Sequence, residues 1–351
     1  MQRRNFIKGT AAAAILGTGG YKTLAKGIIQ ESKKKDLLIP ARLKPGDTIG
    51  LVAPGSFITE NELKESVQNL EELGFKVAYS KNILARSGYL GGTDKQRADD
   101  VNNMFERKDI NGIFCARGGY GCARILPILD YGKIEKNPKV IIGYSDITAL
   151  LYGIYSQTGL VCYHGPVGIS TFNEFSVYNM ENVLMQPSAS FAMISKPDKE
   201  DDELYKIYPI RSGIAKGELV GGNLSIVVSL IGTKYDIDTT GKIVFLEDVG
   251  EEPYRIDRML TQMIEAGKFD NAAGIALGVF KHCRVKKENP SFKTSFNLRE
   301  VLFDRLYKLG VPVIYGLSFG HIENKFTLPF GIKAKLDVTN QTLTLLEKAV
   351  L

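Results

Sequence analysis

The sequence predicts an α/β protein of two domains built on a mainly parallel sheet, and three observations carry this prediction. The 351 residues suffice for about two domains of ordinary size. A hydrophobic fraction of 44% and a charged fraction of 24% are typical of a globular chain and exclude disordered and collagen-like classes. From Asp47 onward, short apolar runs alternate with helical segments, which is typical of βαβ units with helices on both faces of the sheet.

The first domain is predicted over residues 43–170. Helices are expected between its strands, one over 63–73 that stops at Gly74 and one over about 94–107 with Thr93 as its N-cap. This alternation predicts a doubly wound domain. The expected strands are the apolar runs 48–53, 76–79, 112–116, 140–143 and 160–163.

The apolar pattern then breaks. Residues 171–212 contain polar and acidic stretches and several prolines, so they are predicted as a domain linker. A second domain is predicted over residues 213–351. Its expected elements are a strand at 242–246, a helix at 253–266, a strand at 274–280, a helix at 298–309, a strand at 312–315 and a closing hairpin near 332–346.

The first 25 residues read as an export signal. Basic residues precede thirteen uncharged residues, Gly9 to Tyr21, a stretch too short to span a bilayer, so no stable membrane span is expected. The run from Arg3 to Lys8 (RRNFIK) resembles the twin-arginine motif, and the alternative is a merely frayed basic N-terminus. Residues 26–42 are expected to be a tether. The protein is therefore expected to be exported, most simply to the periplasm, and to stay in the cytoplasm if the signal does not function.

Net charge and cysteine spacing argue against nucleic-acid binding and against a metal or dithiol site. The net charge is +6, and it falls to +2 without the four basic residues of the leader, so no nucleic-acid partner is expected. The four cysteines lack the C-x-x-C spacing of a zinc site or a dithiol redox motif. No metal and no cofactor are therefore expected.

The sharpest local feature is the run KVIIGYSDI, residues 139–147, in which an apolar strand leads through a tight turn into a helix. Such an elbow exposes the hydroxyl of Ser145 and directs backbone N–H groups toward the same point, which suits a nucleophile that must hold an oxyanion. The run is not G-x-S-x-G, because Ile147 stands in the last glycine position. The alternative is that Ser145 or Asp146 simply caps the helix.

A serine nucleophile needs a base, and the chain offers three histidines. His321 is the best candidate because it follows a strand, where a loop can project its side chain into a cleft. His164 also follows a strand and could bind substrate or satisfy a turn, whereas His282 lies among basic residues and is expected on a solvated face. The strand ending in Glu247 and Asp248 suggests the acid that orients the base, and these neighbours must point to opposite faces. The alternative is that Glu247 and Asp248 are solvated acids at the end of a strand and have no role in a site.

The glycine-rich run ARGGYG, residues 116–121, lies between a buried strand and a helix. It could donate N–H groups to an oxyanion or cradle a phosphate, but it fits neither nucleotide-binding glycine motif. The next residue, Cys122, shares helical spacing with Ile125, Leu126 and Leu129 and is expected to be a core-facing thiol rather than a nucleophile.

Taken together, these motifs resemble the LD-carboxypeptidase family, or murein tetrapeptide carboxypeptidases, which are serine peptidases with a Ser-His-Glu triad. The resemblance runs from about Leu43 to Phe330. The segments that carry it are IGLVAPGS (49–56), ARGGYGCARILPILD (116–130), IIGYSDITALL (141–151), HGPV (164–167), GGNLS (221–225), LEDVGEEPYRIDR (246–258) and the late Gly320-His321.

This resemblance implies a Rossmann-like N-terminal domain, a smaller β-rich C-terminal domain, a site between them and a homodimer. It implies Ser145 as nucleophile, Glu247 as acid and His321 as base, with the backbone N–H groups of Gly118, Gly119 and Asp146 as the oxyanion hole. Arg117 is a candidate for holding the substrate carboxylate.

The expected function is hydrolysis of the L,D amide bond of murein tetrapeptides or muropeptides with release of terminal D-alanine. One alternative is a hydrolase of the same family that cleaves an aminoacyl-nucleotide antibiotic, as in microcin self-immunity. The other is a non-catalytic periplasmic peptide-binding protein. The leader departs from the family pattern, because members that recycle wall peptides often act in the cytoplasm.

Overall fold

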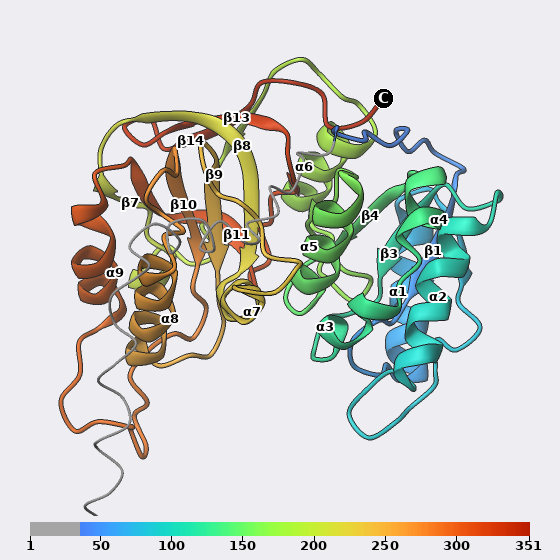
Figure 1. Cartoon of the computed structure of the whole chain (residues 1–351), viewed down its shortest axis with the longest axis horizontal. Coiled ribbons are helices and arrows are strands. Elements are labelled where there is room, and N and C mark those ends of the chain that lie inside the picture. Colours follow the sequence, from blue (N-terminus) through green and yellow to red (C-terminus); the bar gives the residue numbers. More distant parts are fainter. Residues whose placement is uncertain (1–35) are drawn as a thin grey trace, which may run out of the picture. The chain divides into compact units, whose positions relative to one another are not determined.

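Two β-sheets organise residues 36–351, the part of the chain that the computed structural model describes (Figure 1). The predicted leader, residues 1–25, and the start of the tether lie outside the described residues. Neighbouring strands of the first sheet run parallel except for the last pair, β12 and β5. Its six strands lie in the order β12 (Leu328–Pro329), β5 (Tyr163–His164), β4 (Val140–Gly143), β3 (Gly112–Cys115), β1 (Thr48–Val52) and β2 (Lys76–Tyr79).

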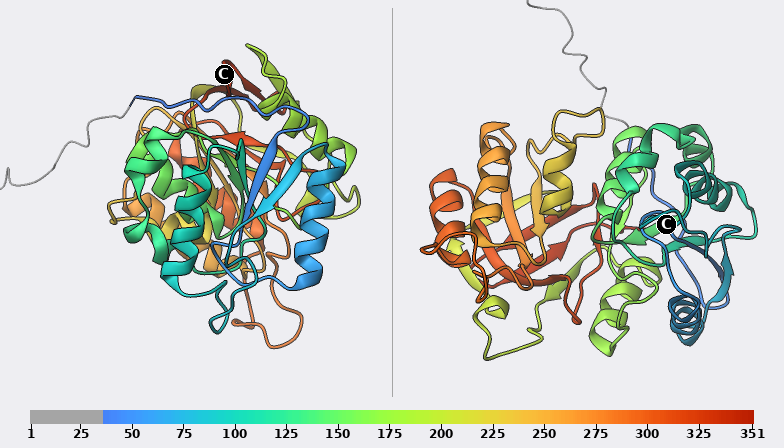
Figure 2. Two further views of the ribbon diagram at one scale, coloured as in Figure 1. Left: turned by 90° about the vertical axis from the view of Figure 1, so that its right-hand side faces the viewer. Right: turned by 90° about the horizontal axis from the view of Figure 1, so that it is seen from below.

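Helices cover both faces of the first sheet. Figure 2 shows α1, in blue, on one side of its strands and the teal helices on the other. The predicted Thr93 cap is present, since the Thr93 side chain accepts from the Gln96 N–H and the Gln96 side chain accepts in return from the Thr93 N–H. The helices of this half are α1 (Glu60–Glu72), α2 (Asp94–Glu106), α3 (Cys122–Ile125), α4 (Tyr131–Lys136), α5 (Ile147–Thr158) and α6 (Glu174–Leu184), with a 3₁₀ turn at Leu126–Ile128.

The second sheet has eight strands within the described residues, which agrees with the β-rich second domain that the resemblance implied. A parallel core of four strands is flanked by antiparallel ones. The order is β6 (Phe191–Ile194), β14 (Thr342–Leu345), β13 (Lys333–Asp337), β8 (Ile214–Asn223), β9 (Ile243–Glu247), β10 (Gly274–Val279), β11 (Val313–Gly320) and β7 (Tyr208–Arg211).

The second sheet is accompanied by the helices α7 (Leu224–Leu230), α8 (Pro253–Glu265) and α9 (Leu298–Leu306), with 3₁₀ turns at Glu203–Tyr205 and Tyr307–Leu309. Helices α8 and α9 contact each other and lie side by side along the sheet (Figure 1). With mainly parallel strands in its first sheet and helices on both faces of that sheet, the molecule confirms the predicted α/β fold class. None of the helices in residues 36–351 is long and apolar enough to cross a membrane.

The segment 171–212, expected to be a linker, contains α6, β6 and β7. Both strands lie at the outer edges of the second sheet. An edge strand tolerates proline because one side of its backbone needs no partner, so Pro209 fits within β7. The prolines and acidic residues that suggested a linker are therefore features of edge strands and their connections.

Strand β5 also differs from its prediction. The expected strand at 160–163 is replaced by a two-residue strand at Tyr163–His164. Leu160 forms an isolated bridge with Leu38, and the Val161 N–H donates to the Leu38 carbonyl at 2.9 Å. The apolar run thus pairs partly with the segment that precedes the first domain.

The segment 321–327 carries the chain from one sheet to the other. It begins directly after β11 of the second sheet and ends at β12, where Leu328 pairs with His164 of the first sheet. A further link joins the sheets, because the Asn223 N–H at the end of β8 donates to the Thr148 hydroxyl of α5 at 3.0 Å. Residues at the ends of β4, β9 and β11 can therefore contribute to one site.

Candidate active site

Ser145 lies in the turn between β4 and α5 with φ of 64°, a left-handed conformation that is rare outside glycine. Its side chain is partly exposed. Asp146 occupies the N-cap position of α5, but its side chain makes no capping hydrogen bond there. The Asp146 carboxylate instead accepts from the Cys122 N–H at 2.9 Å. The structure therefore contradicts capping by Asp146 and has the strained turn of a nucleophile elbow.

The glycine-rich loop lies directly against Ser145. A Cβ atom on Gly118 would stand 2.8 Å from the Ser145 Cβ and 3.1 Å from its Oγ, so only glycine fits there. Within residues 36–351 the backbone N–H groups of Gly118, Gly119 and Asp146 donate no hydrogen bond. Free N–H groups beside a hydroxyl are what an oxyanion hole requires.

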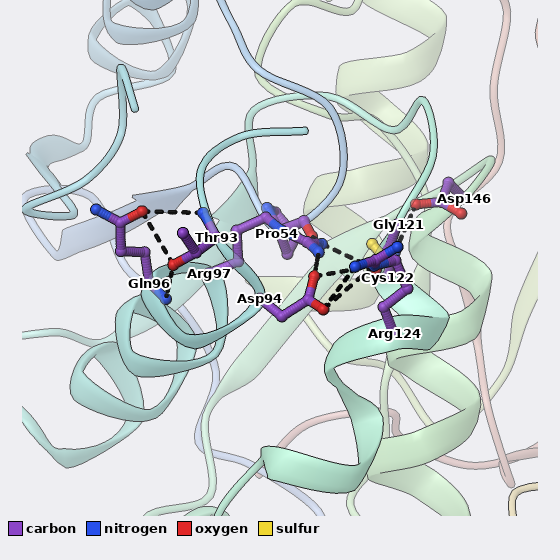
Figure 3. Close-up of polar contacts among 9 residues, drawn as sticks. All are labelled: Pro54, Thr93, Asp94, Gln96, Arg97, Gly121, Cys122, Arg124 and Asp146. Carbon is purple, nitrogen blue, oxygen red and sulfur yellow. Dashed lines mark hydrogen bonds and ion pairs between the residues drawn. The ribbon is translucent and has the colours of Figure 1, made fainter. Parts of the chain in front are cut away.

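A buried arginine holds this loop in place (Figure 3). Arg97 of α2 donates to the carbonyl of Pro54, which follows β1, and to the carbonyl of Gly121 at 2.8 Å. Its guanidinium also pairs with Asp94, which in turn binds Arg124 of α3 at 2.8 Å. The first sheet, α2 and the glycine-rich loop are thereby joined. Sequence reasoning missed Arg97, because nothing in a polar helical segment distinguishes a buried arginine from a solvated one.

His321 and Glu247 form a contact at the second sheet. The His321 Nδ1 lies 2.8 Å from the Glu247 Oε2. Glu247 ends β9 and His321 follows β11, with β10 between them, so both lie at the carboxyl edge of the parallel strands. The Glu247 side chain has 0% exposure and the His321 side chain 18%, which leaves the imidazole reachable.

The two neighbouring acids have different environments. Burial raises the pKa of Glu247, but the charge of His321 and its hydrogen bond outweigh burial and bring the pKa below its usual value. The other Glu247 oxygen accepts from the Asn223 side chain at 3.3 Å. One Asp248 oxygen accepts from the Ser225 N–H at 3.0 Å and the Ser225 hydroxyl at 2.8 Å, and the other accepts from the same Asn223 amide at 3.3 Å. Burial, helped by the Glu247 charge, raises the pKa of Asp248 to about 6.

Tyr144 connects the two halves of the site. It precedes Ser145, and its ring meets the His321 ring edge-on with centroids 4.9 Å apart. No hydrogen bond joins Ser145 to His321 in the part of the chain that the structure describes. Such bonds are often long without substrate and tighten in the substrate complex. The Tyr144 ring therefore places the turn at Ser145 next to the Glu247–His321 pair.

The remaining predicted residues are less available to a substrate. Arg117 pairs with Glu62 at 2.9 Å. His164 is fully buried among aromatic rings, both of its ring nitrogens lack a partner within residues 36–351, and burial lowers its pKa to about 4. Cys122 is also fully buried, and burial raises the pKa of its thiol well above the usual value. His282 is exposed, as expected.

Comparison with known proteins identifies the family. The family model of the LD-carboxypeptidase N-terminal domain matches residues 49–165, and that of the C-terminal domain matches residues 216–336. A Bacillus subtilis protein named "Probable murein peptide carboxypeptidase" is 37% identical over 309 residues, which are 86% of this chain and 92% of that protein.

Two further relatives have solved structures. The Escherichia coli microcin C7 self-immunity protein MccF is 31% identical over 341 residues, 89% of this chain and 96% of that protein. A structure of MccF with glutamyl sulfamoyl guanosine has a TM-score of 0.81 at 28% identity, covering 90% of this chain and 100% of the other. The muramoyltetrapeptide carboxypeptidase of Oxalobacter formigenes has a TM-score of 0.72 at 26% identity, covering 85% and 97%. With both domains matched in order, the chain belongs to the LD-carboxypeptidase family.

Proposed function

We propose that this protein is a serine carboxypeptidase that hydrolyses the L,D amide bond of murein tetrapeptides and releases terminal D-alanine. The observation that carries the proposal is the contact of 2.8 Å between His321 and Glu247, next to the strained turn at Ser145. Relatives named as murein peptide carboxypeptidases support the substrate class.

The mechanism follows from these positions. Glu247 holds the Nδ1 side of the imidazole, so the Nε2 nitrogen of His321 is left to take the proton from the Ser145 hydroxyl as its oxygen attacks the scissile carbonyl. The oxyanion is stabilised by the N–H groups of Gly118, Gly119 and Asp146. The protonated His321 gives its proton to the leaving amine of D-alanine, and water, deprotonated by His321, then hydrolyses the acyl-enzyme.

One observation favours a second candidate function. The structural similarity to MccF, with a TM-score of 0.81, exceeds that to the muramoyltetrapeptide carboxypeptidase, with 0.72. The second candidate is therefore hydrolysis of an aminoacyl-nucleotide. Both candidates use the same nucleophile and differ in the leaving group, so substrate preference separates them.

A substrate panel tests the two candidates. We expect release of D-alanine from a free murein tetrapeptide to exceed the cleavage of its C-terminal amide, its L-alanine epimer and an aminoacyl-adenylate analogue in kcat/KM. Loss of the terminal charge removes a charge-assisted hydrogen bond of about 1.5–3 kcal/mol, which is roughly 10- to 150-fold. Product release by mass spectrometry measures each rate. The carboxypeptidase assignment fails if the amide or the adenylate analogue is cut as fast as the D-alanine peptide.

The same panel addresses the non-catalytic alternative. A peptide-binding protein would bind the tetrapeptide tightly without turnover, and Ser145 would not react with a serine-reactive phosphonate. An enzyme of the proposed type would release D-alanine and be labelled at Ser145. We also propose that the protein forms a homodimer, and the family resemblance is what supports this.

Export through the twin-arginine route is also part of the proposal, supported by the run RRNFIK at residues 3–8. We expect the double substitution Arg3→Lys and Arg4→Lys to retain the protein in the cytoplasm, because that route reads the arginine pair rather than its charge. Cell fractionation with immunoblotting measures the distribution, and Lys8→Arg serves as a control outside the pair. Unchanged export of the double variant would exclude this route.

A further inference from the structure

Lys325 lies four residues after His321 in the segment 321–327, where sequence reasoning assigned no function. It is only 5% exposed. Its backbone N–H donates to the Ser176 hydroxyl at 2.9 Å, and that hydroxyl donates to the Glu323 carbonyl at 2.7 Å. These two hydrogen bonds attach the segment to α6 of the first domain and fix the backbone at Lys325.

The ammonium group of Lys325 lies over the Tyr144 ring, with Nζ 5.6 Å from the ring centroid. Within residues 36–351 it forms no ion pair and no hydrogen bond, so it has no counterion there. Long cationic side chains are rarely this buried unless they are paired. Nζ is not among the fully enclosed polar atoms that lack a partner, so it keeps a contact with solvent. The ammonium group is therefore buried but not sealed from solvent.

Two of the three acids around Lys325 are already engaged, and the third, Glu323, is an exposed residue. The charged neighbours of Lys325 are Asp198, Lys281, Glu323 and Glu247. The Asp198 carboxylate accepts from two backbone N–H groups, at 2.5 Å from Glu323 and 2.8 Å from Asn324, and Glu247 binds His321. Burial lowers the pKa of Lys325 to about 8, only partly offset by Asp198, so the group is still protonated at neutral pH.

We propose that the Lys325 ammonium binds the C-terminal carboxylate of the substrate, an assignment that rests on the proposed carboxypeptidase function. In a carboxypeptidase substrate, only the α-carbon separates that carboxylate from the nitrogen that His321 must protonate. The carboxylate must therefore lie within one residue of the imidazole. The His321 ring and the Lys325 ammonium both lie against Tyr144, at 4.9 and 5.6 Å from its ring.

The assignment also explains why the predicted candidate is less suited to this role. Arg117 already has a carboxylate partner in Glu62, so a substrate anion would have to displace that pair. Lys325 has no such competitor, and a peptide with a free carboxylate supplies the missing charge. An amidated or internal peptide leaves the ammonium unpaired, which selects for cleavage at the chain end.

Kinetics on a matched pair of substrates test the assignment. The variants are Lys325→Met, which removes the charge at similar volume, Lys325→Arg, which keeps it, and Lys308→Met, an exposed control. Each is assayed on the D-alanine tetrapeptide and on its C-terminal amide. We expect Lys325→Met to lower kcat/KM for the acid by roughly 10- to 150-fold and to leave the amide unchanged, because only the acid loses a charge-assisted bond. Lys325→Arg and Lys308→Met should retain a preference for the acid.

Two additional readouts separate binding from a structural role. Removal of an unpaired buried charge should raise the melting temperature of Lys325→Met. In the wild type, the ratio of kcat/KM for acid over amide should fall above pH 8, as Lys325 loses its proton, because ionisations that affect both reactions equally cancel in the ratio. This alkaline decline should be absent in Lys325→Met.

The outcomes are distinguishable. Equal losses on acid and amide, or an unchanged ratio, in Lys325→Met would overturn the carboxylate assignment while leaving the carboxypeptidase function intact. A wild-type protein that cleaves neither peptide would overturn the proposed function, and the assignment with it.

Discussion

Replacement of Ser145 by alanine is expected to lower kcat on a murein tetrapeptide by about 10³ or more, because no other group can form the acyl-enzyme. Alanine tolerates the φ of 64° about as well as serine does, so the elbow and its contact with Gly118 should be preserved. Steady-state release of D-alanine measures the loss, and circular dichroism verifies that the variant is folded.

The matched control is Cys122→Ala. This thiol also lies at a strand-to-helix junction of the first domain, but it is fully buried, and burial raises its pKa well above the usual value. Its removal should cost packing and leave kcat near that of the wild type. Inhibition by a thiol reagent that disappears in Cys122→Ala, combined with an active Ser145→Ala variant, would reverse the assignment of the nucleophile.

Strands with continuous apolar runs were predictable from the sequence. The predicted bounds of β2 and β4 match the structure, since each run is flanked by clear turn or helix signals. Strand β8 was missed because its ten residues include Gly217, Gly221 and Gly222, which give no apolar signal. Gly221 and Gly222 lie against Phe245 of β9 and Thr148 of α5 so closely that no side chain fits. Here tertiary packing, not local propensity, selects the residue.

The proposed triad was predictable for a topological reason. Ser145, Glu247 and His321 each follow or end a strand, and the carboxyl ends of parallel strands are where such folds gather functional side chains. Lys325 was not predictable, because the run ENK at residues 323–325 reads as an ordinary polar loop. Its burial arises only when segment 321–327 crosses to the first sheet and binds α6, which no local pattern encodes.

Replacement of Glu247 by glutamine is expected to lower kcat by about 10³–10⁴, because the isosteric amide favours the wrong imidazole tautomer. The Asn223 side-chain amide nitrogen donates toward one Glu247 oxygen at 3.3 Å, and its orientation is fixed because the Asn223 side-chain oxygen accepts from the Ile226 N–H. The glutamine oxygen must then face Asn223, and its NH₂ group must face the His321 Nδ1. That NH₂ group can only donate, so the imidazole proton moves to Nε2, the atom that must accept the Ser145 proton.

The matched control for this variant is Asp248→Asn, which removes a charge from the next residue without touching His321. Asp248 accepts from Ser225 with one oxygen and from the Asn223 amide, at 3.3 Å, with the other, so its replacement should cost stability while it leaves the contact between Glu247 and His321 in place. Steady-state kinetics of both variants, with kcat and KM measured separately, show whether Glu247 orients His321. Loss of the productive imidazole tautomer lowers kcat, whereas a disturbed binding surface raises KM. If Glu247→Gln keeps near-normal kcat, or if Asp248→Asn loses as much, Glu247 does not orient the base and the Ser145–His321–Glu247 assignment fails at its acid.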